Sequence, residues 1–77
     1  MEEEGIGVGG VALQITFLAF ETGNDWVNEE KVVERIVKRY DVRQKVAELA
    51  ISMSEKFGVI MRKDGKVRVK SQAEKPY

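Results

Sequence analysis

The feature that most constrains the fold is an Asp-Gly pair, Asp64-Gly65, which separates two short β-prone runs at residues 59–62 and 67–70. A two-residue type I′ turn needs a positive φ at both central positions, and Asp-Gly adopts such a turn readily. The pair therefore predicts a β-hairpin with a defined register. In that register Lys63 faces Lys66, Arg62 faces Val67 and Ile60 faces Val69, and one face carries Ile60, Val67 and Val69 toward a core.

Residues 28–40 carry the start signal, the apolar stripe and the end signal of one helix. Asn28 is a good N-cap, and Glu29 and Glu30 follow in the first turn, where the helix dipole favours acidic side chains. Basic residues close the last turn, where the dipole favours them. The stripe predicted to face the core consists of Val32, Val33, Ile36, Val37 and Tyr40.

A second helix is predicted over residues 41–57, directly after the first. Asp41 is placed as its N-cap, Gln44 completes a capping box with it, and Gly58 ends the helix. Because only Tyr40 and Asp41 lie between the two helices, we expect the helices to cross at a steep angle. The predicted core-facing stripe consists of Val46, Leu49, Ala50, Met53 and Phe57, and the opposite face holds Gln44, Glu48, Ile51 and Glu55.

Residues 11–22 fit two kinds of secondary structure. Apolar and polar residues alternate from Leu13 to Phe17, which suits a strand. Leu13, Phe17 and Phe20 also share one face of a helix that Gly23 would end. We expect a helix; a strand would instead give a β-α-α-β-β order.

The chain is expected to form one domain, because 77 residues are close to the smallest number that supports a hydrophobic core. Its parts are predicted as a flexible, acidic and glycine-rich leader at residues 1–10, a folded domain at residues 11–70, and a polar tail at residues 71–77. Trp26 lies in a short extended piece and is expected to anchor the small core.

The sequence contains no cysteine and no histidine. Disulfides and thiolate metal sites are therefore excluded, and so are the nucleophile–histidine pairs of hydrolases. We expect a protein that is not an enzyme, with no catalytic residues, no metal and no small-molecule cofactor. The longest apolar run is too short to span a bilayer, and the acidic leader is unlike a signal peptide, so a cytoplasmic location without membrane contact is expected. The abundance of Glu, Lys, Arg and Val resembles thermophile usage.

Charges are sorted along the chain. Residues 1–34 hold eight acidic residues and one basic residue, a net charge of −7, whereas residues 35–77 hold twelve basic and five acidic residues, a net charge of +7. The basic half contains the second predicted helix and the hairpin. Such a basic surface is the electrostatic pattern expected of a nucleic-acid-binding protein.

The predicted order of helix, short extended piece, helix, tight turn, helix and hairpin resembles the winged helix-turn-helix family over residues 11–70. The resemblance is carried by the helices at residues 28–40 and 41–57 and by the segment FGVIMRKDGKVRVK behind them. It implies an α+β fold with three helices followed by a C-terminal β-hairpin wing. In that family the second helix of the pair tends to lie in the DNA major groove, and the wing tends to touch the backbone or the adjacent minor groove.

By this resemblance the groove-facing candidates are Arg43, Gln44, Lys45, Glu48 and Ser52, and the wing contacts are Lys63, Lys66 and Arg68, with Arg62 and Lys70 beside them. Basic residues at the wing would neutralise phosphates, and Gln44 and Arg43 would offer bidentate contacts to bases. Two other roles stay open. Gln44 completes the predicted capping box, and lysines on an exposed strand also prevent edge-to-edge aggregation.

The resemblance implies a transcriptional regulator from an archaeon, an archaeal virus or a thermophilic bacterium. It would bind double-stranded DNA as a homodimer, with residues 11–20 as the dimer surface. The alternative is a winged-helix module that binds another protein and not DNA. In that case Glu48, Ile51 and Glu55 would meet the partner, since acidic side chains on the groove-facing helix would be repelled by phosphates.

Overall fold

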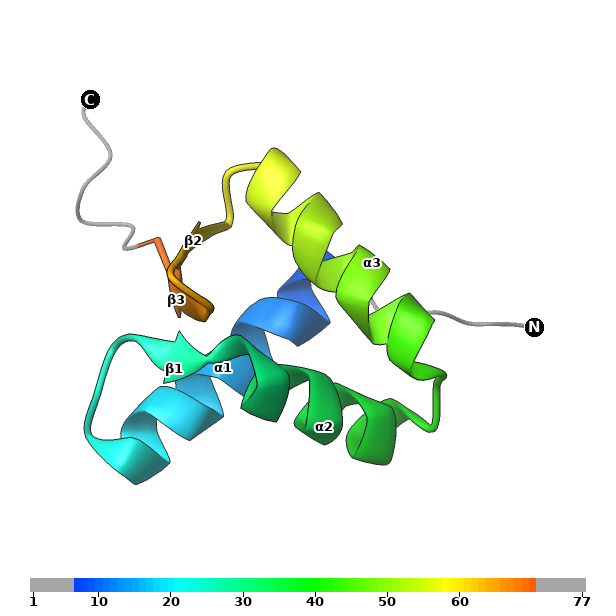
Figure 1. Ribbon diagram of the computed structural model, residues 1–77, viewed down its shortest axis with the longest axis horizontal. Coiled ribbons are helices and arrows are strands. Elements are labelled where there is room, and N and C mark those ends of the chain that lie inside the picture. The colour runs from blue at the N-terminus through cyan, green and yellow to red at the C-terminus, as the bar shows by residue number, and fades with distance from the viewer. Residues whose placement is uncertain (1–6, 71–77) are drawn as a thin grey trace.

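The structure is a computed structural model that describes residues 7–70, so the predictions for most of the leader and for the tail lie outside the described residues. The described part has an α+β layout in which three helices and a small antiparallel sheet follow the order expected of a winged helix (Figure 1). The elements are α1 (Val8–Thr22), β1 (Val27–Asn28), α2 (Glu29–Tyr40), α3 (Gln44–Lys56), β2 (Ile60–Lys63) and β3 (Lys66–Val69). The predicted fold class is therefore confirmed.

The first element is a helix and not a strand, as expected. α1 begins at Val8 with Gly7 as its N-cap, so Gly9 and Gly10, which were predicted to belong to the leader, are helical. At its other end Gly23 adopts the left-handed conformation with φ of 75° and donates its N–H to the Ala19 carbonyl at 2.9 Å. The terminal glycine thus ends the helix in the way its sequence position indicates.

The predicted cap of α2 is confirmed, and so is its apolar stripe except at Tyr40, which is exposed. The Asn28 side-chain oxygen accepts a hydrogen bond from the Glu30 backbone N–H at 3.0 Å, which satisfies one of the free donors of the first turn. Val32, Val33 and Ile36 are buried on the face that meets the core.

The predicted start of the next helix is wrong. α3 begins at Gln44 with Arg43 as its N-cap, and no side chain caps it. Asp41 instead ends α2 in the left-handed conformation, with φ of 54°. The reason is the sharp turn between the two helices, which needs one residue of positive φ, and aspartate tolerates that conformation better than most residues do.

The predicted core-facing stripe of α3 is also wrong, except for Ala50. Ala47, Ala50, Ile51 and Ser54 are the buried residues of this helix, and Ile51, which was expected on the opposite face, has no exposed surface. The bulkier Val46, Leu49, Met53 and Phe57 are exposed. α1 packs directly against α3, and the small side chains of the buried face permit that contact. The hydroxyl of Ser54 donates to the Ala50 carbonyl at 2.8 Å, so its burial leaves no free donor.

The hairpin has the predicted register. Lys63 pairs with Lys66, Arg62 with Val67 and Ile60 with Val69, and both turn residues have positive φ, 53° at Asp64 and 75° at Gly65. β1 adds a third strand by pairing with β3, which gives the order β1-β3-β2. Ile60 and Val67 are buried and Val69 packs beside them, as the alternation predicted.

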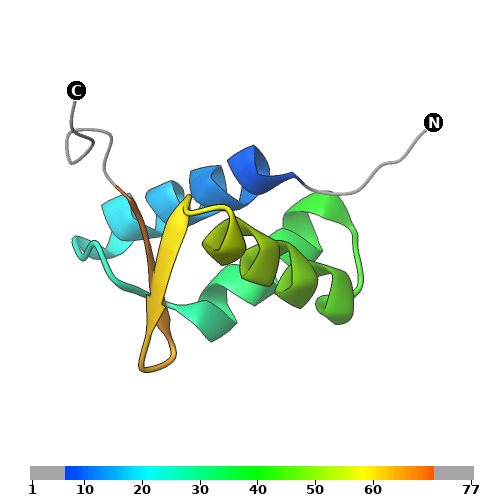
Figure 2. The same ribbon diagram turned by 90° about the horizontal axis from the view of Figure 1, so that it is seen from above.

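The core lies between the three helices and one face of the sheet. It is formed by Val11, Ile15, Val27, Val32, Val33, Ile36, Ala47, Ala50, Ile51, Ile60 and Val67. In Figure 2 the turn of the hairpin projects beyond the helices, on the side away from α1. Among residues 7–70, none of the helices has the length and apolar content needed to cross a membrane.

Candidate nucleic-acid interface

α3 turns a charged face to solvent because its small residues hold the opposite face against the core. At 100° per residue, the positions about half a turn from Ala47 and Ala50 are those of Lys45, Leu49, Ser52 and Lys56, and all four are exposed. The predicted groove-facing residues Lys45 and Ser52 therefore lie on the outward face of this helix.

The hairpin tip carries the two predicted wing lysines. Lys63 and Lys66 are directly opposite each other across the two strands, and both are exposed. The turn between them is anchored to the start of α2, since the Glu29 backbone N–H donates to the Gly65 carbonyl at 2.9 Å. The two charges are thus held at a fixed place on the projecting hairpin.

A cleft of about 660 Å³ separates the hairpin from α3 and from the start of α2. It brings together four of the predicted site residues: Gln44, Ser52, Arg62 and Lys66. Carboxylates line the same cleft, those of Glu29, Glu30, Glu48 and Asp64. Its charge is therefore mixed, whereas the wing residues predicted to contact DNA were all basic.

Arg62 is directed into this cleft and is held there by two carboxylates. Its guanidinium donates to Glu29 Oε2 at 3.0 Å and to Glu55 Oε1 at 3.1 Å, with a longer contact of 3.4 Å to the Ser52 hydroxyl. Partial burial disfavours the charge, but the attraction of Glu29 and the hydrogen bonds to both carboxylates outweigh it and raise the pKa of Arg62. Arg62 thus connects the wing to α2 and α3, and its charge is compensated within the chain.

The start of α3 holds the remaining groove-facing candidates. The Gln44 side-chain amide donates to Glu48 Oε2 at 2.9 Å, one turn further along the helix, so Gln44 has neither the capping role nor a free amide. Arg43 and Lys45, on either side of Gln44, are exposed. They are the groove-facing candidates whose side chains point to solvent without a carboxylate partner among the contacts of the described residues.

Arg68 lies on the other face of the hairpin from the core residue Val67. Its guanidinium carbon is 5.8 Å from the centre of the Trp26 ring, a cation–π distance. Trp26 is only partly buried and is not part of the core, so the prediction that it anchors the core is wrong. The signal that places it beside Arg68 is the pairing of β1 with β3; the sequence predicts the short extended piece but not the strand with which it pairs.

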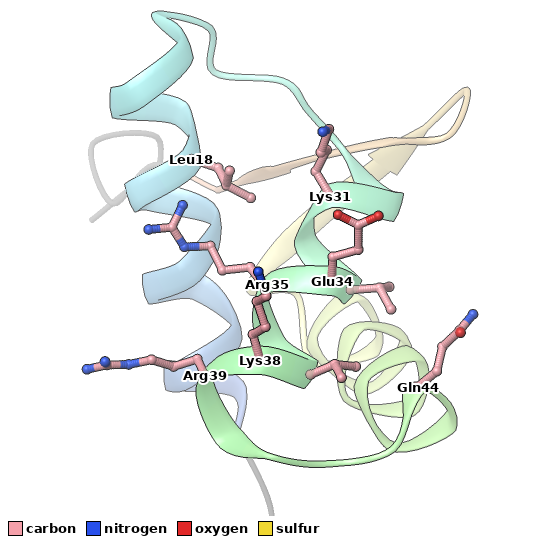
Figure 3. A pocket seen from close by; sticks show the side chains of 9 residues that line it. Leu18, Lys31, Glu34, Arg35, Lys38, Arg39 and Gln44 are labelled. Carbon is pink, nitrogen blue, oxygen red and sulfur yellow. The ribbon is translucent and has the colours of Figure 1, made fainter.

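A second depression, of about 950 Å³, follows the outer side of α2 (Figure 3). Lys31, Lys38 and Arg39 line it, and in Figure 3 Arg39 and Gln44 extend in opposite directions from it. Glu34 is part of the same wall, and Arg35 is bound to the Glu21 carboxylate through two hydrogen bonds of 2.9 and 3.0 Å. This region brings together none of the predicted site residues except Gln44.

The pair of Glu21 and Arg35 is an exposed link between α1 and α2. The hydrogen bond from Arg35 lowers the pKa of Glu21, and the same bond raises the pKa of Arg35. The Arg35 guanidinium also lies 6.0 Å from the centre of the Phe17 ring. Arg35 is therefore engaged with α1 and is not available as a basic contact.

Residues 7–70 contain no group of three or more acidic residues placed to hold a metal ion. No protein-family model matches the chain, and searches of curated proteins and of solved structures found no match.

Proposed function

We propose that this chain is a small DNA-binding protein of the winged-helix type, which contacts duplex DNA through the outward face of α3 and the tip of the wing, and acts as a transcriptional regulator. Lys45, with Arg43 beside it, would meet the major groove at the start of α3. Lys63 and Lys66 would neutralise backbone phosphates beside that groove.

The observation that carries the proposal is the placement of Lys63 directly opposite Lys66 at the projecting tip of the hairpin. Like charges opposite each other in an antiparallel pair destabilise the sheet. The arrangement is thus unfavourable for folding, and it is favourable for binding a polyanion such as DNA.

The carboxylates near α3 are compatible with this proposal. Glu55 is paired with Arg62, and Glu48 lines the cleft and accepts the hydrogen bond from Gln44, so both carboxylates have a partner within the chain. The outward positions of α3 hold Lys45, Leu49, Ser52 and Lys56, none of which is acidic. A phosphate approaching that face would meet Lys45 and Lys56 before either glutamate.

A second copy of the chain belongs to the proposal, because one small module contacts few base pairs and helix-turn-helix dimers read two half-sites. Leu13, Phe17 and Phe20 are exposed on one side of α1, and no residue from Val8 to Phe20 is charged. We propose this face of α1 as the dimer surface.

The test is titration of the protein into a fluorescently labelled random-sequence duplex, followed by anisotropy at about 50 to 300 mM salt. We expect micromolar binding that weakens steeply with salt. In the variant Lys63→Gln with Lys66→Gln, the slope of log affinity against log salt should be smaller by about 2, one unit for each lost phosphate contact.

The matched control is Lys38→Gln with Arg39→Gln, which removes two positive charges from the far end of α2. Its salt slope should stay close to that of the unmodified protein. Equal slopes in the two double variants would contradict the wing contact, and absence of binding at the lowest salt would contradict DNA binding altogether.

One observation favours a second candidate function, a module that binds another protein. Leu49 and Phe57 on α3 are 61% and 65% exposed, and Val46 and Met53 lie on the same flank. Exposed apolar residues gathered on one flank of a helix are typical of a surface that packs against a partner. Ile51, which the sequence assigned to such a contact, takes no part in it because it is buried. This function would be supported if the chain does not bind the duplex and if Leu49→Ser abolishes its binding to a partner protein.

A further inference from the structure

The outer face of the sheet carries a group of residues that neither the cleft nor α3 uses. Val27 and Val67 pair with each other and point into the core, so their neighbours Trp26 and Arg68 point to the opposite face. In the next strand Met61 pairs with Arg68, and Lys63 pairs with Lys66. One aromatic and three cationic side chains therefore gather on the face of the sheet opposite to the core.

This face is hollowed beside Trp26. A depression of about 320 Å³ is lined by Trp26, Lys63, Asp64 and Lys66, which come from two segments far apart in the sequence. Arg68 does not line it, but its guanidinium lies 5.8 Å from the centre of the indole ring that does. Asp64 is the acidic member of the lining, beside two lysines.

The combination of a flat aromatic ring with nearby cations fits one kind of ligand, a planar group attached to a chain of phosphates. Base stacking on aromatic rings and on guanidinium planes, with lysines along the backbone, is how proteins bind single-stranded nucleic acids. In a duplex the faces of the bases are covered by their neighbours, so a ring of this kind cannot stack on them. The expected ligand is therefore an unpaired stretch.

We propose that the outer face of the sheet is a binding site for single-stranded nucleic acid, in which Trp26 stacks on an unpaired base and Lys63, Lys66 and Arg68 neutralise the adjacent phosphates. The site goes beyond the proposed duplex binding, with which it shares the two wing lysines. It does not depend on α3. Trp26 is the residue that distinguishes the two modes, because it lies on the outer face and does not line the cleft.

Trp26 is the only tryptophan of the chain, so its emission reports this site directly. The experiment is a titration of the unmodified protein with a short oligodeoxyuridylate and with the corresponding oligouridylate, followed by tryptophan fluorescence at about 50 mM salt. We expect quenching by stacking with either polymer, and the one bound more tightly identifies the preferred sugar. Binding detected with a labelled oligonucleotide but without a change in emission would overturn the proposal, as would absence of binding.

A variant separates this site from duplex binding. Trp26→Leu keeps an apolar side chain but removes the stacking surface, and it should weaken single-strand binding about tenfold, as loss of one stacked base does. Its affinity for the labelled duplex should be unchanged, and Trp26→Phe should restore part of the single-strand affinity. Equal losses for both ligands in a variant whose circular dichroism is unchanged would overturn the assignment. If the unmodified protein binds the oligonucleotides but does not bind the duplex, the proposed function is contradicted and the single-strand site is supported.

Discussion

The side-chain amide of Gln14 lies in the core, where its Nε2 has no hydrogen-bond partner among the described residues. A buried donor without a partner costs about 1–3 kcal/mol. Gln14 is on the α1 face that holds Val11 and Ile15. The sequence does not predict its burial, because a glutamine between apolar neighbours is expected to face solvent in a strand and in a helix alike.

Replacing the Gln14 side chain tests how much its unpaired amide lowers the stability of the fold. Gln14→Met has a similar length and no polar hydrogen, so it should raise the melting temperature, by about 4–8 °C for each kcal/mol recovered in a domain of this size. Thermal denaturation followed by circular dichroism measures it. Thr16→Met, on the exposed side of the same helix, is the control and should give no comparable gain. A lower melting temperature in Gln14→Met would show that the amide is satisfied.

Other single residues were predicted correctly, because their roles depend on neighbours in the sequence. Asn28 caps α2 through a backbone N–H two residues away, and Asp64 and Gly65 form the turn between adjacent strands. Asp41 shows where such local reasoning ends. Aspartate is common at helix N-caps, but the turn between α2 and α3 needs a residue in the left-handed conformation at position 41. Asp41 therefore ends α2 and does not cap α3.

At the level of the element, α3 has two apolar stripes, and the sequence does not decide between them. One consists of the large residues Val46, Leu49, Met53 and Phe57, and the other of the small residues Ala47 and Ala50 together with Ile51 and Ser54. Periodicity favours the stripe with more apolar surface. The packing of α1 selects the other, because the small side chains allow the two helices to come close.

Two truncations distinguish these faces. Ile51→Ala should lower the free energy of unfolding by about 2–5 kcal/mol, since Ile51 is fully buried and its loss leaves a cavity. Leu49 lies two residues before Ile51 and is 61% exposed, so Leu49→Ala should change the free energy of unfolding by less than about 0.5 kcal/mol. Denaturant unfolding measures both. Equal losses, or a larger loss for Leu49→Ala, would mean that the predicted stripe faces the core after all.

The sequence predicted the helix and the hairpin that form the candidate site, but it did not predict the charge of the site. The hairpin and the lysines at its tip follow from Asp64-Gly65. The inward turn of Arg62 toward Glu29 and Glu55 depends on contacts between the wing and two helices, which no local pattern contains. The position of Trp26 depends in the same way on the pairing of β1 with β3.

For the whole molecule, the acidic and basic halves of the chain meet within one domain. Glu21 binds Arg35, and Glu29 binds Arg62, so each half supplies one partner to each pair. These ion pairs neutralise, within one chain, part of the opposite charge of the two halves. Association of copies through opposite charges is thereby weakened, and the exposed apolar residues of α1 are left as the better surface for a second copy.

A dimer through α1 should sediment at twice the monomer mass of 8.7 kDa, and it should persist at high salt because its contacts are apolar. Leu13→Lys with Phe20→Lys should give the monomer mass, since both side chains are exposed and Phe20 is 88% exposed. Analytical ultracentrifugation measures both. A dimer that dissociates with salt, or a double variant that still dimerises, would place the interface elsewhere.

The contacts that hold the wing have an entropic consequence. Arg62 reaches α2 and α3 at once, and the Gly65 carbonyl is bound to the start of α2, so the hairpin loses its freedom when the chain folds. Little ordering is then left to occur on binding, and the wing meets its ligand already in the bound shape. Its affinity should consequently be governed by charge and by the release of counterions, with only a small contribution from induced folding.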